Sequence, residues 1–173
     1  IDGRALLRAI YGALTGKSSS GGASTITQQL SKMLFTDKPS SGVERVMQKL
    51  KEWIISGQLE KRYTKDEILT MYLNRFDWVN NAVGIKSASQ VYFNKAPIDL
   101  NVLESAMLVG MLKNPSYYNP NRRIELTERR RNIVLSQMRK YDVISDYLFD
   151  SLVQQPIILN FKKASHNEGL APY

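Results

Sequence analysis

The sequence predicts an all-α fold, and three observations lead to that prediction. First, apolar residues recur at spacings of three and four through most of its 173 residues, which is typical of helices packed on a core. Second, residues that commonly cap helices precede several of these segments, and Gly, Pro or Asn follow them. Third, only residues 157–161 alternate in the manner of a strand. We therefore expect helices joined by short connections.

The composition is that of an ordinary globular protein. Hydrophobic residues make up 43% of the chain and charged residues 23%, which argues against a disordered or fibrous class. The length fits one domain, 1–173, large enough to bury a core without metals or disulfides. No apolar run approaches the roughly 20 residues that a membrane span needs. No basic and then apolar leader opens the sequence either, so we expect neither a span nor a leader within it.

Charge and rare residue types limit the chemistry. Cysteine is absent, which excludes thiol catalysis and disulfides within the chain. His166 is the single histidine, which excludes histidine metal clusters and Ser/His/Asp triads, and we expect it in a surface loop. The chain has 24 Lys and Arg against 16 Asp and Glu, a net charge of +8. This balance favours acidic partners such as nucleic acid, anionic lipid or a phosphorylated substrate.

The periodic segments predict helices along the whole chain. An amphipathic helix is expected at residues 1–14. Flexible connections are expected at residues 16–22, which are rich in Gly and Ser, and at residues 36–42. The most apolar helix, starting at Asp99 or Asn101, is expected to be the centre of the core. The remaining helices are expected at residues 24–34, 43–63, 64–74, 85–93, 125–141 and 145–155.

The most informative stretch reads GGASTITQQLSK, residues 21–32. Its two glycines allow a tight backbone, and Ser24 or Thr25 can then cap the helix that follows. Thr25 and Gln28 also have the spacing of a capping box, which leaves other backbone N–H groups at the positive end of the helix dipole to face an anion. The stretch is either a solvated helix face or a cradle for sugar and phosphate. Its polar side chains include Thr27, Gln28, Gln29, Ser31 and Lys32.

Two stripes run along the helix expected at residues 43–63. An apolar stripe follows the helical period and is expected to be buried. A polar stripe lies beside it and places two cations and a carboxylate on one edge of the helix. The polar stripe is either a solvated, salt-bridged face or part of a site. The apolar stripe comprises Val46, Leu50, Trp53 and Gly57, and the polar stripe comprises Arg45, Lys49, Glu52 and Ser56.

Later helices contain residues with expected structural roles. Asn74 is expected to cap the C-terminus of the helix at residues 64–74, whose N-terminus has a capping box made by Thr64 and Glu67. Glu104 lies inside the most apolar helix and needs a partner, because a buried lone carboxylate is costly. Arg130 falls on an apolar helix face, and we expect its guanidinium to pair with Glu104.

Four segments together resemble one family. GGASTITQQ is similar to the second motif, Gly-x-Ser-Thr-Ile-Thr-Gln-Gln, of the peptidoglycan glycosyltransferase domain (glycosyltransferase family 51) of class A penicillin-binding proteins and their monofunctional relatives. QKLKE, residues 48–52, resembles the third motif, Arg-Lys-x-x-Glu, with Gln48 in place of a bidentate arginine, so that phosphate contact rests on Lys49. KDEILTMYLN, residues 65–74, and RRNIVL, residues 130–135, match the fourth and fifth motifs.

The resemblance implies a lysozyme-like glycosyltransferase domain with a larger helical lobe and a smaller, mobile lobe that faces the membrane. It implies an enzyme of cell wall synthesis that polymerises lipid II into β-1,4 glycan strands and releases undecaprenyl pyrophosphate. Glu52 is implied to be catalytic and to lie near the pyrophosphate or its divalent cation, Mg or Mn. Structural roles are implied for Asn74, Glu104 and Arg130. Substrate contacts are implied for Ser24, Thr25, Thr27, Gln28, Gln29, Lys32, Arg45 and Lys49.

The family's first motif, Glu-Asp-x-x-Phe-x-x-His-x-Gly, supplies the general base and should end immediately before Ile1. No Glu-Asp pair occurs in the sequence, so we expect the chain to be N-terminally incomplete and inactive as given. The resemblance also implies an upstream transmembrane anchor, a location at the outer, periplasmic face of the cytoplasmic membrane, and residues 156–173 as a linker toward a possible transpeptidase domain. The implied partners are lipid II, the glycan strand, and proteins of the divisome or the elongation machinery.

Three other functions are weighed against this one. A lysozyme-like hydrolase shares the implied shape but lacks the GGASTITQQ stretch. A non-catalytic lysozyme-like module that binds lipid-linked glycan is favoured by the missing base and by Gln48. A helical nucleic-acid binder is supported only by the net charge and by residues 129–131, and no recognition-helix pattern accompanies them, so we expect no nucleic acid partner.

Overall fold

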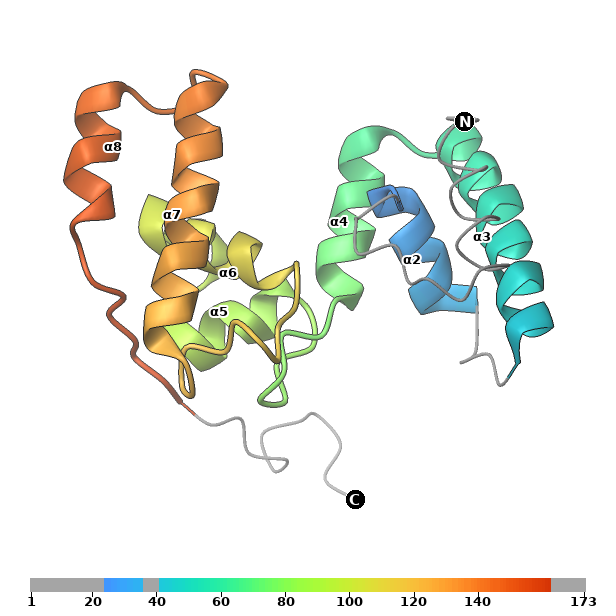
Figure 1. Cartoon of the computed structure of the whole chain (residues 1–173), viewed down its shortest axis with the longest axis horizontal. Helices are drawn as coiled ribbons and strands as arrows, with labels where there is room; N and C mark the ends of the chain where they lie inside the picture. Colours follow the sequence, from blue (N-terminus) through green and yellow to red (C-terminus); the bar gives the residue numbers. More distant parts are fainter. Residues whose placement is uncertain (1–23, 36–40, 163–173) are drawn as a thin grey trace. The chain divides into compact units, whose positions relative to one another are not determined.

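The computed structural model describes residues 24–35 and 41–162; the helix expected at residues 1–14 and most of both flexible connections lie outside this range. Within it every regular element is a helix, which confirms the all-α prediction, and one isolated antiparallel bridge joins Asp77 and Val83. The chain divides into two compact units, Ile1–Arg75 and Phe76–Tyr173. The elements of Figure 1 are α2 (Ile26–Phe35), α3 (Gly42–Arg62), α4 (Lys65–Arg75), α5 (Ile85–Phe93), the short 3-10 helix η1 (Pro97–Asp99), α6 (Val102–Met111), α7 (Ile124–Lys140) and α8 (Asp146–Val153).

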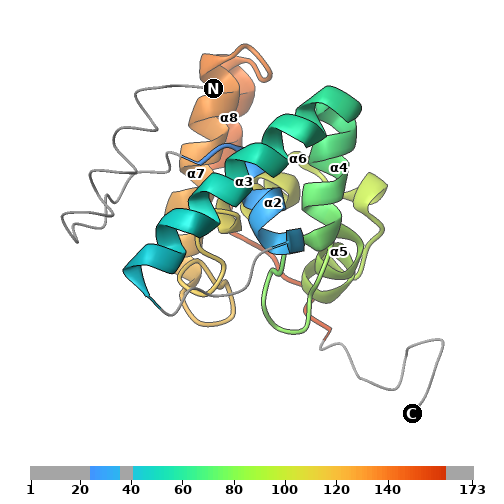
Figure 2. The same ribbon diagram turned by 90° about the vertical axis from the view of Figure 1, so that its right-hand side faces the viewer.

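In the first unit, α2 packs against both α3 and α4 (Figure 2). Local hydrogen bonds fix where two of these helices begin. Ser41 caps α3 by accepting a hydrogen bond from the backbone N–H of Glu44 at 3.2 Å. Thr64 and Glu67 form both hydrogen bonds of the predicted capping box at the start of α4. None of the helices in the described residues is both long enough and apolar enough to span a bilayer.

The prediction of a buried apolar stripe on α3 is wrong. Leu50 is 42% exposed, whereas Glu52 and Ser56 of the polar stripe are 1% and 5% exposed. The reason lies in α2, which presents the fully buried Ser31 to α3. The hydroxyl oxygens of Ser31 and Ser56 lie 3.0 Å apart in a hydrogen bond. Because these polar groups satisfy one another, α3 can bury them at little cost.

The second unit has an apolar core centred on α6, as the sequence predicts. α6 packs against α7, and α7 packs against α8, beside which it lies in Figure 1. The helix begins with the capping box formed by Asn101 and Glu104. The indole nitrogen of the fully buried Trp78 donates to the carbonyl of Leu108 at 3.1 Å and ties the loop after α4 to α6. One buried cluster of this unit contains Ala106, Leu135, Ile144 and Leu152.

Two predicted structural roles are wrong. Asn74 lies inside α4, which continues to Arg75, so Asn74 does not cap the helix. Arg130 does not pair with Glu104 but donates from Nε to the carbonyl of Gly110 at 3.2 Å. Glu104 lies in the first turn of α6 and Gly110 in the last, six residues and about 9 Å of helix rise away. A cation there meets the negative end of the α6 dipole.

Glu104 has a different cation as its partner. Its Oε1 accepts from Lys95 Nζ at 2.7 Å, and its Oε2 accepts from the backbone N–H of Asn101 at 2.9 Å. The prediction that Glu104 is paired is therefore correct, although the predicted partner is wrong. Residues 157–161, which were expected to form a strand, form none. The segment instead hydrogen-bonds to the end of α5: the backbone N–H of Asn160 donates to the carbonyl of Tyr92.

Candidate active site

Glu52 is the centre of the candidate site. It lies in the middle of α3, and its side chain is 1% exposed. Each carboxylate oxygen has a donor from the turn before it: Gln48 Nε2 donates to Oε1 at 3.0 Å, and Lys49 Nζ donates to Oε2. Gln48 and Lys49 precede Glu52 by four and three residues, spacings that bring each donor onto the helix face of the carboxylate. The buried carboxylate therefore has one ammonium and one amide as its side-chain partners.

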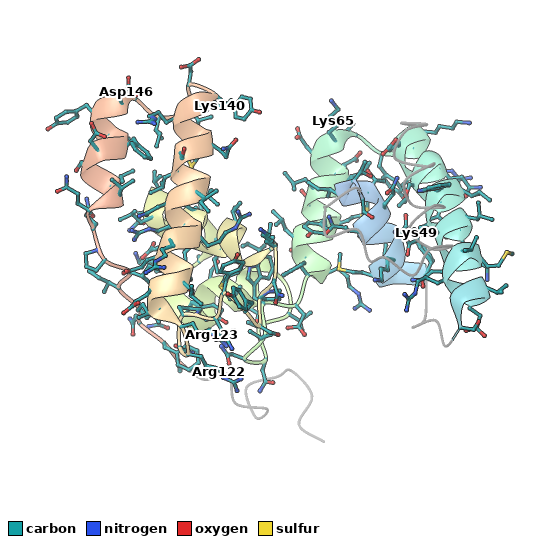
Figure 3. The ribbon with its side chains drawn as sticks, viewed as in Figure 1. Lys49, Lys65, Arg122, Arg123, Lys140 and Asp146 are labelled. Atoms are coloured by element: carbon teal, nitrogen blue, oxygen red, sulfur yellow. The ribbon has the colours of Figure 1, made fainter. Side chains whose placement is uncertain are left out.

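Lys49 connects this carboxylate to the start of α2. Its ammonium also donates to the hydroxyl of Ser24 at 3.2 Å, across 25 positions of sequence. The side chain is 36% exposed, so solvent and solutes reach a cation whose other side is fixed to Glu52. Figure 3 labels Lys49 on α3. The second and third sequence motifs thus meet in space through Ser24, Lys49 and Glu52, as the prediction of a shared site requires.

The N-terminus of α2 is organised by its polar residues. Thr25 Oγ1 accepts from the backbone N–H of Gln28 at 3.2 Å, which confirms Thr25 as a cap. Gln29 has two partners: its Nε2 donates to the carbonyl of Ser24 at 3.4 Å, and its Oε1 accepts from the hydroxyl of Tyr72 at 3.1 Å. The amide of Gln29 therefore connects Tyr72 of α4 to Ser24, which Lys49 also contacts.

The other predicted substrate residues differ in exposure. Thr27 is 7% exposed, and its carbonyl accepts from the Ser31 hydroxyl, so it lies inside the packing of the unit. Gln28 is half-buried at the start of α2. Lys32 in the last turn of α2 and Arg45 in the first turn of α3 are exposed. The substrate roles of Lys32 and Arg45 stay predictions.

Sequence reasoning did not assign roles to Gln48, Ser56 and Tyr72. Gln48 was noted only as a departure from a motif, yet it holds one oxygen of Glu52. Ser56 donates to the carbonyl of Glu52, one turn earlier. Tyr72 is 3% exposed, and burial raises the pKa of its phenol, so it stays a neutral donor to Gln29. The i+4 spacing of Gln48, Glu52 and Ser56 was the signal that could have identified two of them.

The arrangement can attract and hold an anion. The positive end of the α2 dipole and the half-exposed ammonium of Lys49 lie beside Ser24, which offers a hydroxyl for hydrogen bonding. Glu52 fixes Lys49 by charge, so the cation loses little rotamer freedom when a ligand binds. A phosphate or pyrophosphate group is the kind of anion that the α2 N-terminus, Lys49 and Ser24 together can bind.

A divalent cation fits this arrangement poorly. Both oxygens of Glu52 already have donors, and one of these is an ammonium, so a metal would have to replace Lys49. In residues 24–35 and 41–162 there is no cluster of three or more acidic or histidine side chains that could hold a metal ion.

The comparisons with known proteins agree with this geometry. A family model described as transglycosylase matches residues 1–139. Penicillin-binding protein 1A of Haemophilus influenzae is 33% identical over 164 residues, 95% of this chain and 19% of that protein. Penicillin-binding protein 1A of Escherichia coli is 37% identical over 161 residues, 93% of this chain and 18% of that protein. Penicillin-binding protein 1F of Bacillus subtilis is 38% identical over the whole chain, which is 24% of that protein.

A solved structure extends the comparison to the fold. The crystal structure of penicillin-binding protein 1A from Haemophilus influenzae matches with a TM-score of 0.53 and 34% identity, over 60% of this chain and 16% of that one. The helical fold and its division into two units accord with the lysozyme-like architecture that the sequence motifs imply. The chain spans about a fifth of the length of the curated relatives it matches. On the family model and these identities, the chain belongs to the transglycosylase family.

Proposed function

We propose that this chain is the glycosyl-transfer domain of a peptidoglycan glycosyltransferase that polymerises lipid II into β-1,4 glycan strands and releases undecaprenyl pyrophosphate. The observation that carries the proposal is the contact of Ser24 with Lys49 and of Lys49 with Glu52, which unites two motifs of the family. In this proposal Lys49 and the N-terminus of α2 neutralise the pyrophosphate as it leaves. Glu52 holds Lys49 in place, and Gln48 holds Glu52.

The remaining parts of the proposal concern what the reaction needs beyond these residues. The general base comes from the family's first motif, which this sequence does not contain, so residues 1–173 alone are expected to bind substrate without turnover. The parent protein is expected to act at the outer face of the cytoplasmic membrane with an upstream anchor, next to divisome or elongation proteins. No step is assigned to a Mg or Mn ion; such an ion stays a prediction, which loss of turnover in EDTA and its recovery with Mg would support.

The test is lipid II polymerisation by the protein with its natural N-terminal segment. Glu52→Gln should lower turnover by roughly 100-fold or more, as the loss of one preorganised electrostatic group does elsewhere. Glu60→Gln on the exposed side of the same helix is the matched control and should retain full turnover. Lys49→Met, which leaves Glu52 in place, should cause a loss of similar size.

Binding and turnover must be measured separately. Lipid II binding with no turnover in the unchanged protein would contradict the proposal and favour the non-catalytic module. Full turnover in both Glu52→Gln and Lys49→Met would remove these residues from the site. Circular dichroism at 222 nm before each assay distinguishes a lost function from a lost fold.

A further inference from the structure

A second polar site lies in the other unit, in a cavity of about 160 Å³ bounded by the end of α5, the start of α6, the middle of α7 and the segment after α8. A cavity of this size is comparable with an engineered one of roughly 150 Å³ that takes up benzene. Ile158 in its wall is 78% exposed, so the cavity reaches the surface. It therefore has room for a small molecule or a protruding side group.

Arg131 forms part of the wall and is the unusual feature of this cavity. Its side chain is 1% exposed. Nε and Nη2 both donate to Asn132 Oδ1, at 3.0 and 2.9 Å, and Nη1 is the third nitrogen of the guanidinium. Among the buried side-chain polar atoms of residues 24–35 and 41–162, Nη1 of Arg131 is the one without a hydrogen-bond partner.

Arg131 also lacks a close counter-ion. The ion pairs found in the described part of the chain are Lys49 with Glu52, Lys95 with Glu104, and Arg139 with Asp146. Burial lowers the pKa of the Arg131 guanidinium, and nearby Glu128 opposes this shift without forming a salt bridge; Glu128 Oε1 accepts from the backbone N–H of Ile157. Buried charges in proteins are ordinarily paired, so the buried guanidinium of Arg131 favours a negatively charged group as a ligand of this cavity.

The other residues that line the cavity indicate the chemistry of the rest of the ligand. Phe93, Leu103, Met107 and Ile157 contribute apolar surface. Glu104 is the acidic residue in the wall, and Lys95 neutralises it at 2.7 Å, so it does not oppose an anion with its full charge. A guest that satisfies both parts of the lining carries one carboxylate on a small apolar body.

We infer that this cavity binds a small apolar carboxylate, with its oxygens on Nη1 of Arg131 and its carbon body against Leu103 and Met107. A guanidinium matches the planar carboxylate geometry and forms charge-assisted hydrogen bonds with it. The carboxylate arrives either on a free small acid or at the C-terminus of a short peptide. This inference does not rest on the proposed glycosyl transfer, because every residue in it lies in the second unit.

The test is an NMR titration of the full chain labelled with 13C at its methionine methyl groups. Met107 is 1% exposed in the cavity wall, and Met47, 52% exposed on α3, is the internal reference. Isobutyrate is the free-acid probe, and alanyl-alanine is the peptide probe. Isobutyramide and alanyl-alanine amide have nearly the same shapes without the carboxylate charge. A saturable shift of Met107 with either carboxylate, and none with its amide, is the expected result.

Variants assign the binding to Arg131. Arg131→Met should weaken the successful probe by roughly 10- to 100-fold, the amount expected for a hydrogen bond to a charged group. Arg129→Met, an exposed neighbour on α7, should leave binding unchanged. If Arg131→Met does not fold, Ile157→Trp keeps the guanidinium, fills the cavity from the tail and should also abolish the shift.

Three results would overturn the inference. These are no saturable shift of Met107 with either carboxylate, equal shifts with acid and amide, or binding that survives Arg131→Met or, where that variant does not fold, Ile157→Trp. A response to isobutyrate alone identifies a free small acid as the guest, and a response to alanyl-alanine alone identifies a peptide C-terminus. Either response supports the carboxylate site.

Discussion

α3 and α6 bury opposite kinds of surface. The buried residues of α3 are Glu52 and Ser56, whose polar atoms are held by hydrogen bonds. The buried residues of α6 are Ala106, Met107, Leu108, Gly110 and Met111. Apolar burial is non-directional and stabilises in proportion to area, whereas hydrogen bonds fix orientation with a smaller net gain. The difference indicates that α6 is held by its apolar core, and that α3 is oriented by buried polar groups that also hold Lys49 and, through it, Ser24.

Truncating one leucine in each helix tests this difference most strongly. Leu108→Ala removes a side chain that is 1% exposed in α6, and it should lower the free energy of unfolding by about 2 to 5 kcal/mol. Leu50→Ala in α3 removes a side chain that is 42% exposed, and it should cost less than about 1 kcal/mol. Urea unfolding followed by circular dichroism measures both. A cost for Leu50→Ala equal to that for Leu108→Ala would show that α3 is held by apolar packing after all.

The buried serine pair provides a smaller test of the first unit. Ser31 and Ser56 share a hydrogen bond of 3.0 Å and are 0% and 5% exposed. Replacing either with Ala should cost about 0.5 to 1.5 kcal/mol, because the remaining hydroxyl loses a partner. The double variant should cost less than the sum of the two single variants. Strict additivity in the double-mutant cycle would mean that the hydroxyl pair does not couple α2 to α3.

In a strained loop of the second unit, one substitution should raise the free energy of unfolding, whereas the substitutions above lower it. Val79, Asn80 and Asn81 have φ of 59°, 53° and 63°, and the left-handed region is costly for a β-branched residue such as Val79. Val79→Gly should therefore raise the free energy of unfolding by about 0.5 to 1 kcal/mol. Val83→Gly is the control: Val83 is 54% exposed and not at positive φ, so the same change should destabilise. The two changes in thermal midpoint should have opposite signs, and equal signs would contradict the strain argument.

The sequence predicted the helices well because their signals are local. Thr64 and Glu67 are three residues apart and form the capping box that their spacing predicts, and Asn101 begins α6 as one of its two expected starts. The site at Ser24, Lys49 and Glu52 could be predicted only because two motifs resembled one family. Periodicity alone had left the polar stripe of α3 open between a solvated face and a site.

Two of the errors concern which groups meet across helices. Arg130 and Glu104 were expected to pair because each needed a partner, but the sequence does not give the level at which α7 crosses α6. Leu50 was expected to be buried because it is apolar, but the buried face of α3 is decided by what α2 presents to it. Periodicity identifies the faces of a helix, but it does not tell which of those faces a neighbouring helix will cover.

The capping box of α4 allows the mildest test, which uses pH. The backbone N–H of Thr64, and then its hydroxyl, donate to the Glu67 carboxylate and hold its pKa below the ordinary value of 4.5. A carboxyl whose pKa is lower in the folded state stabilises above its unfolded pKa, and that contribution is lost as the pH falls through the folded pKa. The α4 N-terminus should therefore fray only below about pH 4.5. A 13C titration of the carboxyl of Glu67 measures this directly, and Thr64→Ala should raise the pKa only in part, because the backbone donor is the larger cause. A folded pKa at or above 4.5 would mean that the Glu67 carboxylate does not cap α4.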